Sequence, residues 1–255
     1  REAHFYCEYM ITPADSEAAF KRFNSDTMTI SRALPKEFKI LRINTVDGEE
    51  PTCDYVSPPA GCMGGGTRNA TKVPGRITVH QGGRLLFDSG EYVENESGMT
   101  LKIRGNTSAY GAKKPYKIKL QKKHDLLERG DEKKYSDSEW ILINGAANLN
   151  TMIGLSSSAH IGFCWVPAWE YVNVVVNDDY RGLYVLVENY KKNKSCRAPV
   201  EDTGFLVEKD AYWWNEDLYF DTSVYALNMK YTFKYPSKED ISANSLMYIQ
   251  DYVNK

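Results

Sequence analysis

The clearest β-hairpin of this chain is YVNVVVNDDYRGLYVLVE, residues 171–188. Its two halves, 171–176 and 183–188, are runs of β-branched and aromatic residues, which are typical of strands. The polar segment 177–182 between them is typical of a turn. Strands this apolar must cover a core. The side chains expected in that core are those of Val172, Val174, Val176 and, opposite them, Leu183 or Tyr184.

Shorter segments with two-residue alternation lie on both sides of this hairpin. The expected strands are 38–43, 77–79, 85–87, 101–104, 116–120, 139–143, 204–208 and 231–233. Gly82-Gly83 predicts the turn of a second hairpin, and 53–74, rich in proline and glycine, is expected to be a loop. The connections are hairpins rather than strand–helix–strand units. The sequence therefore predicts an α+β fold, an antiparallel β-sheet with hairpins and a few packed helices.

Helices are expected at two places in the chain. Residues 152–161 have apolar side chains at helical spacing and are followed by Gly162, a common helix terminator. Ser237-Lys-Glu-Asp240 resembles a capping box and predicts the start of a helix that runs to about residue 253. Residues 1–34 are expected to be an irregular or partly helical lead-in, and 35–255 a single domain.

The composition is that of an ordinary soluble globular protein. The net charge is −2 and the isoelectric point about 6.2, so nothing indicates a nucleic-acid partner. Apolar stretches such as 140–143 are too short to form a transmembrane segment. The five cysteines contain no C-x-x-C pair. Cys53 and Cys62 flank the loop and either form a disulfide in an oxidising compartment or remain free thiols.

Common catalytic motifs are missing from the sequence. Gly61-Cys-Met-Gly-Gly-Gly-Thr67 resembles half of a phosphate-binding P-loop but lacks the lysine that reaches the phosphates, so it is interpreted as a flexible loop. The four histidines are too far apart in the sequence to indicate a metal site. There is no G-x-S-x-G, no H-E-x-x-H and no dinucleotide-binding G-x-G-x-x-G after a strand.

Four ordered blocks of sequence resemble one family. LKIRGNTS (101–108) with KKPYKIKL (113–120), WILIN (140–144) with NLNTM (148–152), VVVNDDYRGLYVLVE (174–188) and TGFLVEKD (203–210) resemble the signature of the spore coat protein H (CotH) kinases. The resemblance covers about residues 36–255. It identifies the chain as the amino-terminal portion of a secreted bacterial member, whose location is secreted, periplasmic or at the cell surface.

The resemblance implies an atypical protein kinase. Members of the family bind ATP with a divalent metal such as Mg²⁺ and phosphorylate serine or threonine on secreted or surface proteins. The fold is then expected to resemble the N-lobe side of a kinase-like fold. The nucleotide-binding residues implied are Arg104, Lys114 and Glu188. If Glu188 acts as the kinase glutamate, its carboxylate lies within about 4 Å of the Lys114 ammonium. The alternative for Glu188 is a structural salt bridge.

The sequence departs from the family pattern at functional positions. An arginine of the family is replaced by Ile153, and an aspartate by Asn148. Neither the family's N-x-D-x-x-x-x-N motif nor its W-D-x-D motif occurs in the 255 residues, so we assign no catalytic residue and no metal ligand. The expectation is that this polypeptide does not transfer phosphate and binds nucleotide weakly and salt-sensitively at most.

A different class of function is also compatible with these departures. The chain is then a non-catalytic surface module that binds glycans or proteins. Ile153 and an exposed aromatic run, Tyr212-Trp213-Trp214, favour this alternative.

Overall fold

The computed structural model describes residues 38–144, 149–163, 165–193, 197–222 and 230–255. The lead-in predicted for 1–34 lies outside these residues. The strands are β1 (Lys39–Thr45), β2 (Asp54–Val56), β3 (Gly66–Arg68), β4 (Val73–Gln81), β5 (Arg84–Asp88), β6 (Met99–Ile103), β7 (Tyr116–His124), β8 (Asp137–Ile143), β9 (Trp169–Val176), β10 (Asp179–Glu188), β11 (Leu206–Asp210), β12 (Tyr219–Phe220) and β13 (Lys230–Tyr235). The α-helices are α4 (Glu132–Tyr135), α5 (Leu149–His160) and α6 (Ala243–Val253). The α+β prediction is confirmed.

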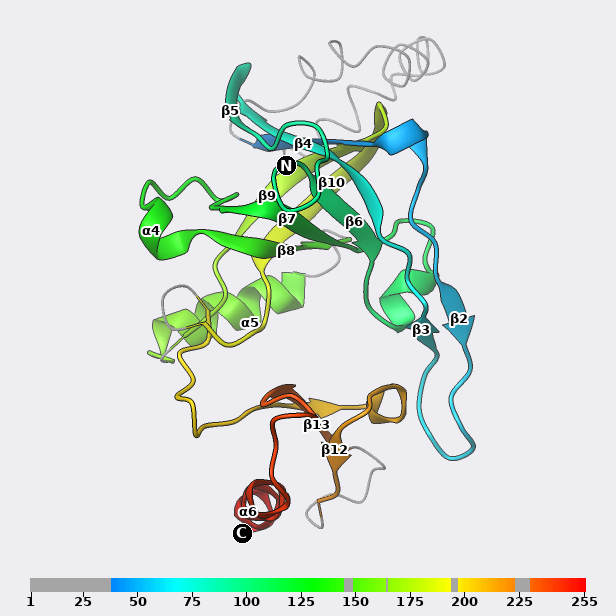
Figure 1. The fold of residues 1–255 in the computed structure, drawn as a ribbon, viewed down its shortest axis with the longest axis vertical. Helices are drawn as coiled ribbons and strands as arrows, with labels where there is room; N and C mark the ends of the chain where they lie inside the picture. Colours follow the sequence, from blue (N-terminus) through cyan, green and yellow to red (C-terminus); the bar gives the residue numbers. More distant parts are fainter. Residues whose placement is uncertain (1–37, 145–148, 164, 194–196, 223–229) are drawn as a thin grey trace.

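The large sheet closes on itself as a barrel. Its strand order is β1-β9-β10-β8-β7-β6-β4, and β4 pairs again with β1, which leaves β5 as an outer hairpin strand on β4 (Figure 1). Every pairing in this ring is antiparallel except that of β1 with β9, which is parallel. The sequence predicted an antiparallel sheet but neither the closure nor the parallel pair.

The barrel interior is the main hydrophobic core. Val172, Val174 and Val176 are fully buried in it, as is Tyr184 on the paired strand, so the prediction for this hairpin is confirmed. The turn is shorter than expected. Asn177 and Asp178 alone connect the strands, both with positive φ, because a two-residue turn of this kind matches the twist of the strands.

Helix α5 covers part of the outer surface of the barrel. Met152 of the helix packs with Ile141 of β8 and with Val185 and Val187 of β10. Strands β2 and β3 form a two-stranded sheet, and the last three strands form a separate sheet in the order β11-β13-β12, which lies below α5 in Figure 1 with α6 beyond it. Within the described residues, no helix is both long and apolar enough to cross a membrane.

Two local predictions are wrong. The segment 53–74 is not only a loop, because β2 and β3 form a hairpin within it. Helix α6 begins at Ala243 rather than near Ser237. Ser242 is its N-cap and accepts a hydrogen bond from the backbone N–H of Ser245, whereas Ser237 donates its hydroxyl to Asp240 in a turn. Cys53 and Cys62 are free thiols in the structure.

Gly75 sits where the barrel closes. It pairs with Thr45 of β1 on one side and Met99 of β6 on the other, and a Cβ at this position would lie 2.9 Å from the Thr45 Cα. We expect Gly75→Ala to lower the free energy of unfolding by about 1–3 kcal/mol, because the backbone of β1 must move away. Gly154→Ala is the matched control, since no atom within 4 Å obstructs a Cβ at Gly154 in α5. Chemical denaturation of both variants tests this. If Gly75→Ala and Gly154→Ala are equally stable, the backbone of β1 accommodates the added Cβ without a cost in free energy.

Candidate functional site

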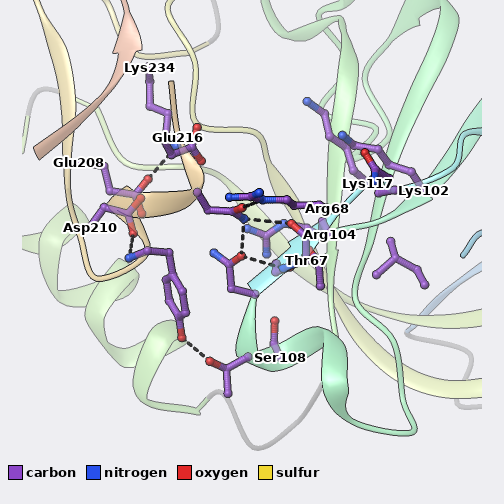
Figure 2. Close-up of a pocket in the computed structure, with 18 residues that line it drawn as sticks. Thr67, Arg68, Lys102, Arg104, Ser108, Lys117, Glu208, Asp210, Glu216 and Lys234 are labelled. Atoms are coloured by element: carbon purple, nitrogen blue, oxygen red, sulfur yellow. Dashed lines mark hydrogen bonds and ion pairs between the residues drawn. The ribbon is translucent and has the colours of Figure 1, made fainter. Parts of the chain in front are cut away.

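A polar cavity lies between the barrel and the small sheet. Its volume is about 720 Å³. One wall is the outer face of β6 and β7, the other is formed by β11 and the segment after it, and β3 with the turn after β6 closes one end. Figure 2 shows Lys102 and Lys117 together on the barrel wall, with Glu208, Asp210, Glu216 and Lys234 across the cavity. Most cationic side chains here come from the barrel, and the carboxylates come from β11 and the segment after it.

Strand β6 places two cations on the barrel wall. Leu101 and Ile103 point into the barrel, so the alternation of the strand directs Lys102 and Arg104 outward. Among the described residues, neither side chain makes a hydrogen bond or an ion pair. Burial lowers the pKa of Arg104, against the opposing effect of Glu208. Burial also lowers the pKa of Lys102, and nearby Lys117 lowers it further. The barrel wall of the cavity therefore holds two cations that are available to a ligand.

A lysine–glutamate ion pair stands beside these cations. Lys117 of β7 lies opposite Lys102 in the strand register, and its ammonium is 3.0 Å from a carboxylate oxygen of Glu139 on β8. Burial on its own would raise the pKa of Glu139, but Lys117 and Lys191 outweigh it and hold the pKa below its usual range. Glu139 thus stays ionised and fixes Lys117 at the edge of the cavity.

Two carboxylates of the opposite wall, Asp210 and Glu208, already have partners, whereas burial raises the pKa of the third, Glu216. Asp210 accepts hydrogen bonds from the Tyr212 backbone N–H (2.7 Å) and from the Thr232 hydroxyl (3.2 Å). Glu208 is 3.1 Å from the Lys234 ammonium. In the part of the chain that the structure describes, no group of three or more His, Cys, Asp or Glu residues could hold a metal ion.

The glycine-rich segment 61–67 connects the two walls at one end of the cavity. The Thr67 hydroxyl donates to the Gly105 carbonyl (2.6 Å), and Asn215 donates to the Thr67 carbonyl (3.0 Å). A Cβ at Gly66 would lie 3.0 Å from the Trp214 ring, so glycine permits this close approach. The segment was expected to be a flexible loop, but its last residues form β3 and join the barrel to the small sheet.

The structure separates the three residues predicted to bind nucleotide. Arg104 lies in the cavity. Lys114 does not line it, and its ammonium donates to the Tyr55 hydroxyl (2.7 Å) and the Ala109 carbonyl (2.9 Å). The predicted Lys114–Glu188 ion pair is wrong. The backbone of Lys114 contacts Tyr184, whereas Glu188 is four residues further along β10, about 13 Å away along the strand.

Glu188 instead forms a buried structural network. Its side chain points to the same side of β10 as Tyr184, and one carboxylate oxygen is 2.8 Å from Arg197 and 2.9 Å from Arg129. The other oxygen accepts from the Ala168 backbone N–H at 3.0 Å. The alternative interpretation of Glu188, a structural salt bridge, is therefore correct.

The sequence did not lead us to Lys102 or Glu139, and Lys117 was interpreted as part of a solvated basic strand edge. The alternation of 101–104 and 116–120 contains the signal, because apolar residues that face a core leave the lysines between them on the other face. The pairing of Lys117 with Glu139 depends on the register of β7 and β8, which the sequence does not reveal.

A family model described as CotH kinase protein matches residues 101–255. The match starts in β6 and extends through α6, so it includes the two strands that form the barrel wall of the cavity and the small sheet opposite. No curated protein matches the sequence.

Proposed function

Because this chain belongs to the CotH kinase family, we propose that its polar cavity binds the phosphates of ATP as part of a phosphotransferase. The observation that carries the proposal is a pair of cations in the cavity wall, Lys102 of β6 and Arg104 directly after it, whose side chains make no hydrogen bond or ion pair with the described residues. Arg104 is half-buried, its side chain makes no hydrogen bond to a described residue, and a phosphate oxygen is the ligand that its donors match best. Lys117, held by Glu139, supplies a third positive charge on the same wall.

The lysine–glutamate pair supports a kinase-like arrangement with one difference. In protein kinases a strand lysine contacts the nucleotide phosphates and a helical glutamate holds that lysine. Here both partners come from adjacent strands of the barrel. We propose that Lys117 and Glu139 take these roles, and that the barrel acts as the N-lobe of the enzyme. Lys114 and Glu188 are left out, because their contacts are made elsewhere.

An adjoining cavity of about 660 Å³ offers a place for the nucleoside. It shares Arg104 and Lys117 with the first cavity and is more apolar. Ile141, Tyr190 and Leu206 line it, and such surfaces suit a heteroaromatic base. A nucleotide whose base lies here has its phosphates directed toward β6.

The residues fit the phosphates better than they fit a metal ion. Mg²⁺ in phosphotransferases is usually held by one or two carboxylates together with the substrate phosphates. Glu208 and Asp210 line the phosphate cavity and would be the carboxylates that hold the ion. A Mg²⁺ ion held there would neutralise negative charge on the phosphates. The described residues do not form a metal site on their own.

The acceptor and the location of the protein are also part of the proposal. Family membership supports protein acceptors with serine or threonine, and a secreted or cell-surface location. The non-catalytic alternative has lost one of its supports, because Tyr212, Trp213 and Trp214 are only half-exposed and Lys230 covers the ring of Trp213 at 4.0 Å.

Calorimetric titration of the protein with ATP, ADP, AMP and tripolyphosphate tests the proposal. We expect saturable binding that weakens as phosphates are removed and as salt is added, because positive charge on the barrel wall supplies the attraction. Tripolyphosphate should bind less tightly than ATP if the second cavity holds the base. A folded protein with no saturable binding at millimolar ATP would contradict the proposal. Phosphate transfer is measured separately with radiolabelled ATP, and for these 255 residues none is predicted.

A further inference from the structure

A second, smaller cavity with a basic lining lies next to the nucleotide cavity on the outer face of the barrel. Its volume is about 110 Å³, and it is lined by Lys72, Thr100, Lys102, Lys117, Lys119 and Glu139. Four of these six side chains are lysines, although the protein as a whole carries a net charge of −2. The basic surface is therefore a local feature of β6, β7 and the residue before β4.

The strand register concentrates these lysines. Lys102 lies opposite Lys117, and Thr100 lies opposite Lys119 on the next outward pair. Like charges directly opposite each other across strands destabilise a sheet. Glu139 is the only carboxylate in the lining, and it is already bonded to Lys117 and to the Asn189 amide (2.8 Å). In the described ranges, Lys72 and Lys119 form no hydrogen bond or ion pair.

The size of the site limits what it can hold. Pockets for whole small-molecule ligands are about 300–1,000 Å³, so a cavity of 110 Å³ accommodates one anionic group and not a nucleotide. It shares Lys102 and Lys117 with the phosphate cavity, so its occupant lies beside the bound phosphates. Lys72 and Lys119 are exposed, so the site is open to a large partner.

We infer that this site binds one acidic side chain of the acceptor polypeptide. The inference rests on the proposed function, since it places the acceptor beside the nucleotide. A carboxylate from the acceptor relieves the repulsion between the lysines, and the rest of the polypeptide remains in solvent across the exposed edge. Acceptors with a glutamate or aspartate near the phosphorylated residue are then preferred over neutral ones.

The test compares two fluorescent serine-containing peptides that differ only in glutamates replaced by glutamines. Anisotropy is measured at low ionic strength, with saturating ATP to fill the nucleotide cavity. We expect the glutamate peptide to bind at least about fivefold more tightly than the glutamine peptide. In the variant Lys72→Gln/Lys119→Gln this preference should fall below about twofold. The variant Lys122→Gln/Lys123→Gln removes the same charge from exposed positions of β7 outside the site and should keep the preference.

Each other outcome overturns the inference. If the two peptides bind equally tightly, the site does not bind an acidic side chain. If both double variants lose the preference for glutamate to the same extent, the attraction is unspecific and comes from surface charge. Competition by inorganic phosphate without any preference between the peptides would indicate a site for free anions instead. ATP affinity should be unchanged in Lys72→Gln/Lys119→Gln, because neither residue lines the nucleotide cavity. If ATP itself does not bind, the proposed function fails, and the same peptide comparison without ATP still decides whether the site takes an acidic side chain.

Discussion

Replacing Glu188 with glutamine is expected to lower the free energy of unfolding by about 3–5 kcal/mol. The carboxylate is 2% exposed and contacts two arginines, of which Arg197 is also 2% exposed. Glutamine keeps the shape of the side chain but removes the charge, so two guanidinium groups lose their shared anion in a buried environment. Breaking a buried pair by changing one partner is costly for this reason, even where the whole pair adds little to stability.

Denaturant unfolding followed by tryptophan fluorescence measures this effect. Arg197 lies 4.8 Å from the ring of buried Trp140, so the emission of that tryptophan reports on the same region. Glu94→Gln is the matched control, because it removes the same charge from an exposed position. A change of less than about 1 kcal/mol in Glu188→Gln, similar to an exposed charge, would mean that the network does not hold the barrel end together.

Arg104→Met should weaken ATP binding by about 10- to 100-fold, the range expected for losing hydrogen bonds to a charged group. The same change should leave stability unaltered or slightly increased. Arg104 makes no side-chain hydrogen bond to any described residue, and burial lowers its pKa although Glu208 opposes this effect. Loss of binding without loss of stability distinguishes a ligand-binding arginine from a structural one.

Calorimetric ATP titration and thermal unfolding of the same sample provide the two readouts. Arg84→Met on β5 removes an equal charge from an exposed position and should change neither. If Arg104→Met binds ATP as tightly as the unaltered protein, Arg104 does not contact the phosphates. If it unfolds at a clearly lower temperature, the arginine has a structural role in the cavity wall.

Local patterns in the sequence predicted most strands and helix α5. The strands of the 171–188 hairpin are recognisable because β-branched residues dominate them, and Gly82-Gly83 has the positive φ values that its turn requires. The closure of the barrel was not predictable in this way. It depends on β1 pairing with β9, and no local pattern specifies which distant strand becomes a neighbour.

The candidate site was likewise predictable only where local sequence patterns define it. Arg104 was found through its motif, and Lys102 and Lys117 could have been found from the alternation of their strands. Lys114 was misplaced because it precedes β7 and turns toward Tyr55. The partner of a charged residue depends on register and on loops such as the one that carries Arg197. Sequence alone could therefore propose that Glu188 needs a partner, but not which one.

The parallel pair of β1 and β9 also bears on how the protein is made. Ile40 pairs with Asn173, so the strands that close the ring are separated by more than half of the chain. During synthesis, β1 and β4 can pair early, but the ring cannot close before β9 has left the ribosome. Contacts this distant in sequence slow folding, because a long loop must be ordered before they form. Until then the apolar sides of β1, β4 and β6 lack part of their core, and incompletely closed sheets of this kind are prone to aggregate.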